Sequence, residues 1–176
     1  VRGDLYLRNL PKLEELSMQV RSVLGEFRLQ NLDVISDISL SHLEEVGGSF
    51  HFDENLSAIA VVIPNIIEFS DDVSIVGNDS IRTITFPPLA SVGGELDISY
   101  NLSLSELSFE INSIDDITIE ANSMLSSINF VDLYALYGNI SVVSNPLLQT
   151  ITISELTNIG DSLQVIDNEL LTVVNF

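Results

Sequence analysis

Asparagine recurs about every 23 residues along this chain, each time in the same local setting. Two apolar residues that alternate with polar ones precede each asparagine, as Leu96 and Ile98 precede Asn101. Further apolar residues follow at fixed offsets, as Leu107 and Phe109 do. A repeat of this length predicts a solenoid, in which each unit buries its apolar side chains only against its neighbours. The recurring asparagines are Asn9, Asn31, Asn55, Asn78, Asn101, Asn122, Asn145 and Asn168.

Each unit predicts three short strands and leaves no room for a helix of ordinary length. The segments before and after the asparagine both alternate apolar and polar residues, which is the pattern of half-buried strands. A third apolar pair, such as Leu43 and Val46, closes most units. We therefore expect a mainly β fold: a right-handed parallel β-helix, or irregular leucine-rich-repeat solenoid, of about eight rungs of 21–23 residues with an asparagine ladder. Residues 1–176 are expected to form one solenoid domain.

Two features of the interior follow from this register. Asparagine both donates and accepts through its side chain, so the stacked asparagines are expected to turn inward and satisfy backbone groups of neighbouring rungs. A row of calcium or sugar ligands is the less favoured interpretation of the same ladder. Phe86, Phe109 and Phe130 occupy one position in three successive units, so their rings are expected to stack inside the coil.

Glycine or aspartate begins every unit. Both residues tolerate turn geometry better than branched residues do, so these positions predict corners with unusual backbone angles. The acidic pairs Asp71-Asp72 and Asp115-Asp116 belong to such corners, and a role in the turn is sufficient to explain them. The units begin at Gly3, Gly25, Gly48, Asp71, Gly94, Asp115, Gly138 and Asp161.

The net charge of −20 is distributed unevenly, which limits the classes of partner. Residues 1–28 hold five of the six Lys and Arg residues, whereas residues 29–176 carry 22 acids and only Arg82 as a base. Nucleic acid is excluded as a partner because phosphate binding draws on Lys and Arg, and an anionic membrane surface is disfavoured for the same reason. No apolar run approaches the length of a membrane span, so no membrane insertion is expected. Cations or basic partners remain compatible with this charge, and the simpler interpretation is a solvated acidic surface that keeps the protein soluble.

Two segments carry a resemblance to a known family. Residues 89–104 (LASVGGELDISYNLSL) and residues 159–168 (IGDSLQVIDN) resemble receptor L-domain repeats. That family comprises irregular leucine-rich coils in glycosylphosphatidylinositol-anchored fungal cell-wall proteins, bacterial surface proteins and the ectodomains of insulin- and EGF-type receptors. The resemblance covers all eight units and implies an extracellular or cell-surface location. The chain departs from the receptor members because it has no cysteine and no tryptophan.

Few residues stand out as candidate sites. Asn139 is the candidate glycan acceptor, because it is the one Asn-x-Ser asparagine off the ladder and is expected at an outward position of a strand. His42 and His51 are expected to be exposed and free of metal, since a zinc site would need two further ligands. No catalytic residue and no cofactor is expected, and no Ser–His–Asp set is visible. The abundant carboxylates are compatible with weak calcium binding at the surface.

Two outward rows are expected to be flat and polar, with short side chains. Such rows are suited to a protein or glycan partner, although they lack the aromatic anchors of tight interfaces. Thr83 to Thr85 and Thr150 to Thr152 resemble ice-binding coils, but they occupy only two rungs of eight. The first-strand row is Tyr6, Arg28, His51, Ser74, Asp97, Thr118, Ser141 and Gln164; the second-strand row is Ser17, Ser39, Val62, Thr85, Ser108, Asn129, Thr152 and Asn175.

Together these features favour a non-catalytic repeat domain of an extracellular or cell-surface protein, acting in adhesion, wall organisation or ligand binding. The alternative from another class is a calcium-assisted, polysaccharide-active enzyme on a β-helix, and an ice-binding coil is a remote third. The lack of Lys and Arg after Arg82 disfavours the enzyme. Neither end offers a cysteine loop, a helix pattern or a charged cap, so the chain is expected to be part of a longer coil, with neighbouring repeats or chains at its ends.

Overall fold

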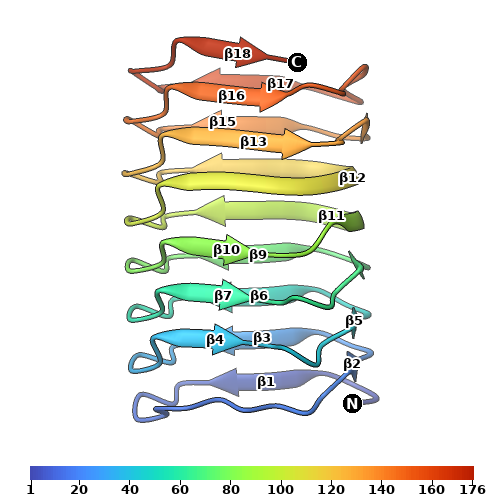
Figure 1. Cartoon of the computed structure of the whole chain (residues 1–176), viewed down its shortest axis with the longest axis vertical. Coiled ribbons are helices and arrows are strands. Elements are labelled where there is room, and N and C mark those ends of the chain that lie inside the picture. Colours follow the sequence, from blue (N-terminus) through green and yellow to red (C-terminus); the bar gives the residue numbers. More distant parts are fainter.

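Strands form where apolar residues alternate, and the strands of successive units pair in parallel (Figure 1). The computed structural model describes residues 1–176, and every regular element in it is a strand. Coils about 23 residues apart stack into a β-solenoid of about seven turns, which confirms the predicted fold class. No helix of this structure is long and apolar enough to cross a membrane.

The coil has three faces, and we number its rungs from 1 to 8 along the chain. The strands of the first face are β1 (Leu5–Arg8), β3 (Phe27–Gln30), β6 (Phe50–Asp53), β9 (Val73–Val76), the end of β11 (Leu89–Ser99), the end of β12 (Glu106–Glu120), β15 (Ile140–Val143) and β17 (Leu163–Ile166). The second face holds β4 (Asp37–Ser39), β7 (Ala60–Val62), β10 (Thr83–Thr85), the start of β12, β13 (Ser127–Val131), β16 (Thr150–Ile153) and β18 (Val173–Asn175). The third face holds β2 (Ser22–Val23), β5 (Glu45–Val46), β8 (Glu68–Phe69), the start of β11, the middle of β12 and β14 (Ala135–Leu136).

The inward apolar residues form one continuous cluster of 41 buried side chains along the coil. Ile111 and Ile114, which were not predicted, supply the third apolar pair of rung 5. In rung 1, Leu16 and Met18 pack against this core without forming the predicted strand. The strands are short and half-buried, so burial of their inward side chains is the main stabilising term.

A column of aromatic rings runs through the core. The rings of Phe86 and Phe109 stack with their centroids 5.5 Å apart and their planes at 17°, and Phe130 continues the column 6.1 Å from Phe109. This confirms the predicted stack and its register, since Phe109 is only 5% exposed. The column also reaches further than predicted: it includes Phe27, Phe50 and Phe69 at centroid separations of 5.3–5.6 Å.

Six asparagines turn inward at the corner between the first and second faces. The carboxamide oxygen of each one from Asn78 onward accepts the backbone N–H of the asparagine in the rung before, at 3.0–3.1 Å. The carboxamide nitrogen donates to a first-face carbonyl, as Asn101 does to Ile75 at 2.7 Å. These bonds satisfy polar groups that the tight corner removes from water. The inward asparagines are Asn55, Asn78, Asn101, Asn122, Asn145 and Asn168.

Asn9 and Asn31 do not belong to this ladder, so the prediction is wrong for the first two rungs. Each follows the second inward residue of its strand by two positions, whereas the ladder asparagines follow by three. Asn9 and Asn31 therefore occupy the left-handed corner position, with φ of 56° and 54°, which asparagine tolerates better than most residues. Leu32 fills the ladder position of rung 2, fully buried, and its N–H donates to Asn55 Oδ1 at 3.1 Å.

Four of the five glycines that begin units allow close packing between rungs, which corrects the prediction of unusual backbone angles. Among the glycines only Gly77 has a positive φ, and it lies after β9 rather than at the start of a unit. A side chain at Gly94 would collide with the carboxylate of Asp72 in the rung before. That carboxylate accepts the N–H of Glu95 at 2.9 Å, and the same arrangement recurs at two other corners. At these three corners the glycine of one rung therefore leaves room for the aspartate carboxylate of the rung before.

Candidate functional site

The outward row of the first face is continuous, as predicted. Tyr6 pairs with Arg28, Arg28 with His51, and His51 with Ser74 across neighbouring strands. The row continues through Asp97 in β11. Because strands lie roughly 4.8 Å apart, side chains of successive rungs are close enough to interact.

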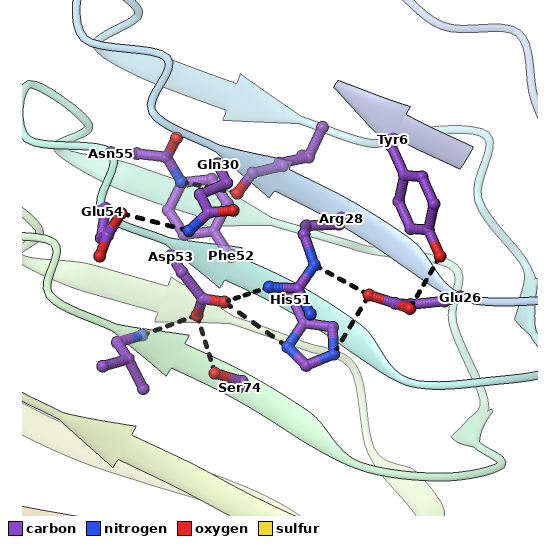
Figure 2. A network of polar contacts seen from close by, with 12 residues as sticks. Tyr6, Glu26, Arg28, Gln30, His51, Phe52, Asp53, Glu54, Asn55 and Ser74 are labelled. Carbon is purple, nitrogen blue, oxygen red and sulfur yellow. Dashed lines mark hydrogen bonds and ion pairs between the residues drawn. The ribbon is translucent and has the colours of Figure 1, made fainter. Parts of the chain in front are cut away.

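Asp53 lies at the centre of a polar network on rungs 1–4 (Figure 2). It is only 8% exposed, and both of its oxygens are occupied. Oδ1 accepts the hydroxyl of Ser74 at 2.7 Å, and a backbone N–H of β9 at 3.3 Å. Oδ2 lies 3.6 Å from the guanidinium of Arg28 and 3.5 Å from Nδ1 of His51. A buried carboxylate requires such partners, so this arrangement is well satisfied.

Glu26 closes the other side of the network. Its Oε1 accepts a hydrogen bond from Nε of Arg28 at 2.8 Å and lies 3.5 Å from Nε2 of His51. Its Oε2 accepts a hydrogen bond from the Tyr6 hydroxyl at 2.9 Å. Burial raises the pKa of Glu26, but the hydrogen bonds from Arg28 and Tyr6 outweigh it, so the net pKa is lowered. The hydrogen bond to Glu26, with burial and Asp4, raises the pKa of Tyr6 to about 12. We call Tyr6, Glu26, Arg28, His51, Asp53 and Ser74 the Glu26–Asp53 network.

His51 is held between two carboxylates, so the prediction that both histidines are exposed is wrong for it. Its side chain is 19% exposed and packs between Glu26 and Asp53. His42 lies beside β5 at the second-to-third corner, where its Nδ1 is 3.2 Å from the hydroxyl of Ser41. The sequence places Arg28 and His51 next to each other in one row, but the direction of each side chain depends on the rotamers of the assembled network.

The arrangement of Ser74 and His51 is not that of an activated nucleophile. A Ser–His–Asp triad needs a hydrogen bond from the serine hydroxyl to the imidazole, which accepts its proton. Here the Ser74 hydroxyl donates to Asp53 instead, and His51 reaches the same carboxylate from the other side. The surface hollows of the protein also lie at other places on the coil. Ser74 and His51 therefore share one carboxylate and do not form the nucleophile–base pair of such a triad.

Beyond rung 3 every charged side chain on the first face is acidic. Glu95 and Asp97 lie on β11, and Glu120 lies at the end of β12. Burial raises the pKa of Asp97, as do the neighbouring charges of Glu95, Asp53 and Glu120, although a hydrogen bond from Ser99 opposes this. No Lys, Arg or His is present on this part of the face, because Arg82 precedes β10 on the second face. We call Glu95, Asp97 and Glu120 the acidic patch.

Tyr100 borders the acidic patch. Its ring is half exposed, and its hydroxyl donates to Glu120 Oε1 at 3.1 Å. That hydrogen bond and the charge of Glu120 raise the pKa of Tyr100, so the ring stays neutral. A cation that approached the patch would meet three carboxylates with an aromatic ring beside them.

Asn139 lies immediately before β15 rather than within the strand, and its carboxamide is engaged. Its Nδ2 donates to Asp116 Oδ1 at 2.8 Å, and its Oδ1 accepts the hydroxyl of Ser162 at 2.6 Å. A glycan would replace one of the two hydrogens on Nδ2 and would have to fit beside the contact with Asp116; glycosylation stays a prediction. The structure also contains no group of three or more His, Asp or Glu side chains placed to hold a metal ion, and weak calcium binding likewise stays a prediction.

Comparison of the chain with protein-family models, curated proteins and solved structures gives no significant match. The resemblance to receptor L-domain repeats therefore rests on the sequence motifs alone, and the account of function rests on the charge and shape of the faces.

Proposed function

We propose that this chain is a non-catalytic binding module whose first face holds a basic partner over the acidic patch. The observation that carries the proposal is the uncompensated charge of Glu95, Asp97 and Glu120. In rungs 1–3 the chain supplies its own cations, since Arg28 and His51 lie against Glu26 and Asp53. On the first face of rungs 4–6 it supplies none, because Arg82 lies before β10 on the second face. A partner that carries Lys or Arg would neutralise the carboxylates of the later rungs, as Arg28 and His51 do for Glu26 and Asp53 on the earlier rungs.

The geometry of the solenoid supports a binding role. Strand pairing keeps the patch on two adjacent rungs, because Ser99, two residues after Asp97, pairs with Glu120 in the next rung. A rigid surface loses little conformational entropy when a partner binds, which favours affinity. The partial desolvation of Asp97 also strengthens its attraction for a cation compared with a fully hydrated carboxylate.

The test is binding of a short lysine–serine peptide, measured by fluorescence anisotropy over a range of salt concentrations. The variant Glu95→Gln, Asp97→Asn, Glu120→Gln removes the patch charges while keeping similar shapes. Each exposed ion pair contributes about 0.5–1 kcal/mol, so affinity should fall by roughly tenfold to a hundredfold. Binding by the unchanged protein should weaken as salt rises, because salt screens surface charges.

A matched control removes the same charge elsewhere. Glu68, Glu106 and Glu155 are exposed and form no side-chain hydrogen bond or ion pair. Their replacement by glutamine should weaken binding much less than the patch variant does. Equal weakening by the two variants would mean that net charge alone attracts the peptide, and the proposal of a first-face site would be wrong.

We further propose that the module acts at the cell surface or outside the cell, in adhesion, wall organisation or ligand binding. This part rests on the resemblance to receptor L-domain repeats. Protease treatment of intact cells tests it, because a surface protein carrying this chain should be cleaved without lysis of the cells. The competing enzyme hypothesis is tested by incubation with acidic polysaccharides, with and without calcium. Release of new sugar ends would overturn the non-catalytic assignment.

A further inference from the structure

The turns between the first and second faces share one geometry in rungs 3–8. In each, the carbonyl of the ladder asparagine accepts the N–H of the residue three positions later, as Asn101 accepts from Leu104 at 3.2 Å. Two residues lie between them at the tip of a β-turn. These turns form the left-hand edge of Figure 1.

The second tip residue changes from polar to apolar along the coil. In rungs 3–5 it is a serine, whereas in rungs 6–8 it is Met124, Leu147 and Leu170. These three side chains are 52%, 38% and 48% exposed. Because serine forms the same turn three times in this chain, the fold does not require an apolar residue there. We call Met124, Leu147 and Leu170 the turn strip; the serines are Ser57, Ser80 and Ser103.

The turn strip begins at the corner that directly follows the acidic patch in rung 6. Met124 follows Glu120 by four residues within rung 6, and Tyr100 bonds to Glu120 from rung 5. Stacked apolar side chains on an exposed edge are typical of an interaction surface. A second copy of this chain is a poor occupant, since each copy carries a charge of −20.

We infer that the partner is a basic amphipathic protein segment, whose cations contact the acidic patch and whose apolar side chains pack on the turn strip. This inference rests on the proposed function, because the charge of the patch defines the sign of the partner. The acidic patch provides attraction and orientation. The turn strip adds burial of Met and Leu side chains, which discriminates an amphipathic segment from a merely basic one.

The experiment compares two peptides of equal length and charge, one alternating lysine and leucine and the other alternating lysine and serine. The unchanged protein should bind the lysine–leucine peptide roughly tenfold more tightly. The variant Met124→Ser, Leu147→Ser, Leu170→Ser should lose that preference and bind both peptides alike. Circular dichroism should show an unchanged fold, because serine is native at this position of the turn. If the triple variant does not fold, Met124→Ser alone should halve the preference or reduce it further.

Two controls separate this inference from the proposed function. Leu56 is an exposed tip residue on rung 3, 48% exposed and outside the turn strip, so Leu56→Ser should keep the preference. The acidic-patch variant should bind both peptides more weakly than the unchanged protein does. The turn-strip variant could retain the full preference for the lysine–leucine peptide while the acidic-patch variant binds both peptides more weakly. In that case the turn strip does not contact the partner, and only the proposed function stands. If the unchanged protein binds neither peptide, both fail.

Discussion

Replacement of Asn101 by leucine tests whether the ladder stabilises the coil. Its Nδ2 donates to Ile75 O at 2.7 Å, and its Oδ1 accepts Asn78 N at 3.1 Å. Leucine would leave this carbonyl and this N–H without partners inside the coil. Each unsatisfied buried group costs about 1–3 kcal/mol, and the added apolar burial offsets roughly 1 kcal/mol. We therefore expect a loss of about 1–5 kcal/mol in the free energy of unfolding, measured by denaturant titration.

The shape of leucine is not the expected problem, because Leu32 already fills the ladder position of rung 2. There the rung before it is more exposed, so water can reach the backbone groups that a ladder asparagine would satisfy. Asn112→Leu is the control, since Asn112 lies off the ladder and makes no side-chain hydrogen bond. Equal losses for Asn101→Leu and Asn112→Leu would refute the assignment of a stabilising role to the ladder bonds.

Three further predictions test the core and the polar groups. Phe109→Ala should lower the free energy of unfolding by roughly 3–5 kcal/mol, because its ring contacts two others in the column, whereas Ser108→Ala should change it little. Because folding raises the pKa of Asp97 above its usual value of 3.8, the stability it contributes is present at low pH and is lost as pH rises through the raised pKa. Asp97→Asn should therefore remove that loss in denaturant titrations over a pH series, and an unchanged pH profile would contradict the assignment. Ultraviolet absorbance titration should show Tyr6 ionising near pH 12, and Glu26→Gln should lower that pKa; no change would mean that the hydrogen bond is not formed in solution.

The solenoid could be predicted from sequence because alternation with a period of two assigns each residue to the inside or outside of a strand. One repeated asparagine then aligns the units, and the aligned register places Phe86 over Phe109 without further information. At Asn9 and Asn31 the recurrence of about 23 residues continues, but the offset of the asparagine from its strand changes. The signal was present: both follow the inward residue by two positions rather than three.

The polar network could be predicted only in part. The row placed Arg28 beside His51, but Asp53 belongs to the next outward position of β6. Its burial comes from the side chains of Arg28, His51 and Ser74 closing over it, which depends on rotamers rather than on periodicity. The role of the corner glycines also could not be predicted. A side chain there would collide with an aspartate of the neighbouring rung, and this contact exists only once the rungs are stacked.

Amide chemical-shift mapping locates the face of the coil that binds the peptide. An isotope-labelled sample titrated with the lysine–leucine peptide should show its largest shifts along β11 and the end of β12, near Asp97 and Glu120, and in the turn that holds Met124. Amides of β13 and β16 on the second face should change little. Shifts concentrated on the second or third face, or shifts spread evenly over the coil, would contradict a binding site on the acidic first face.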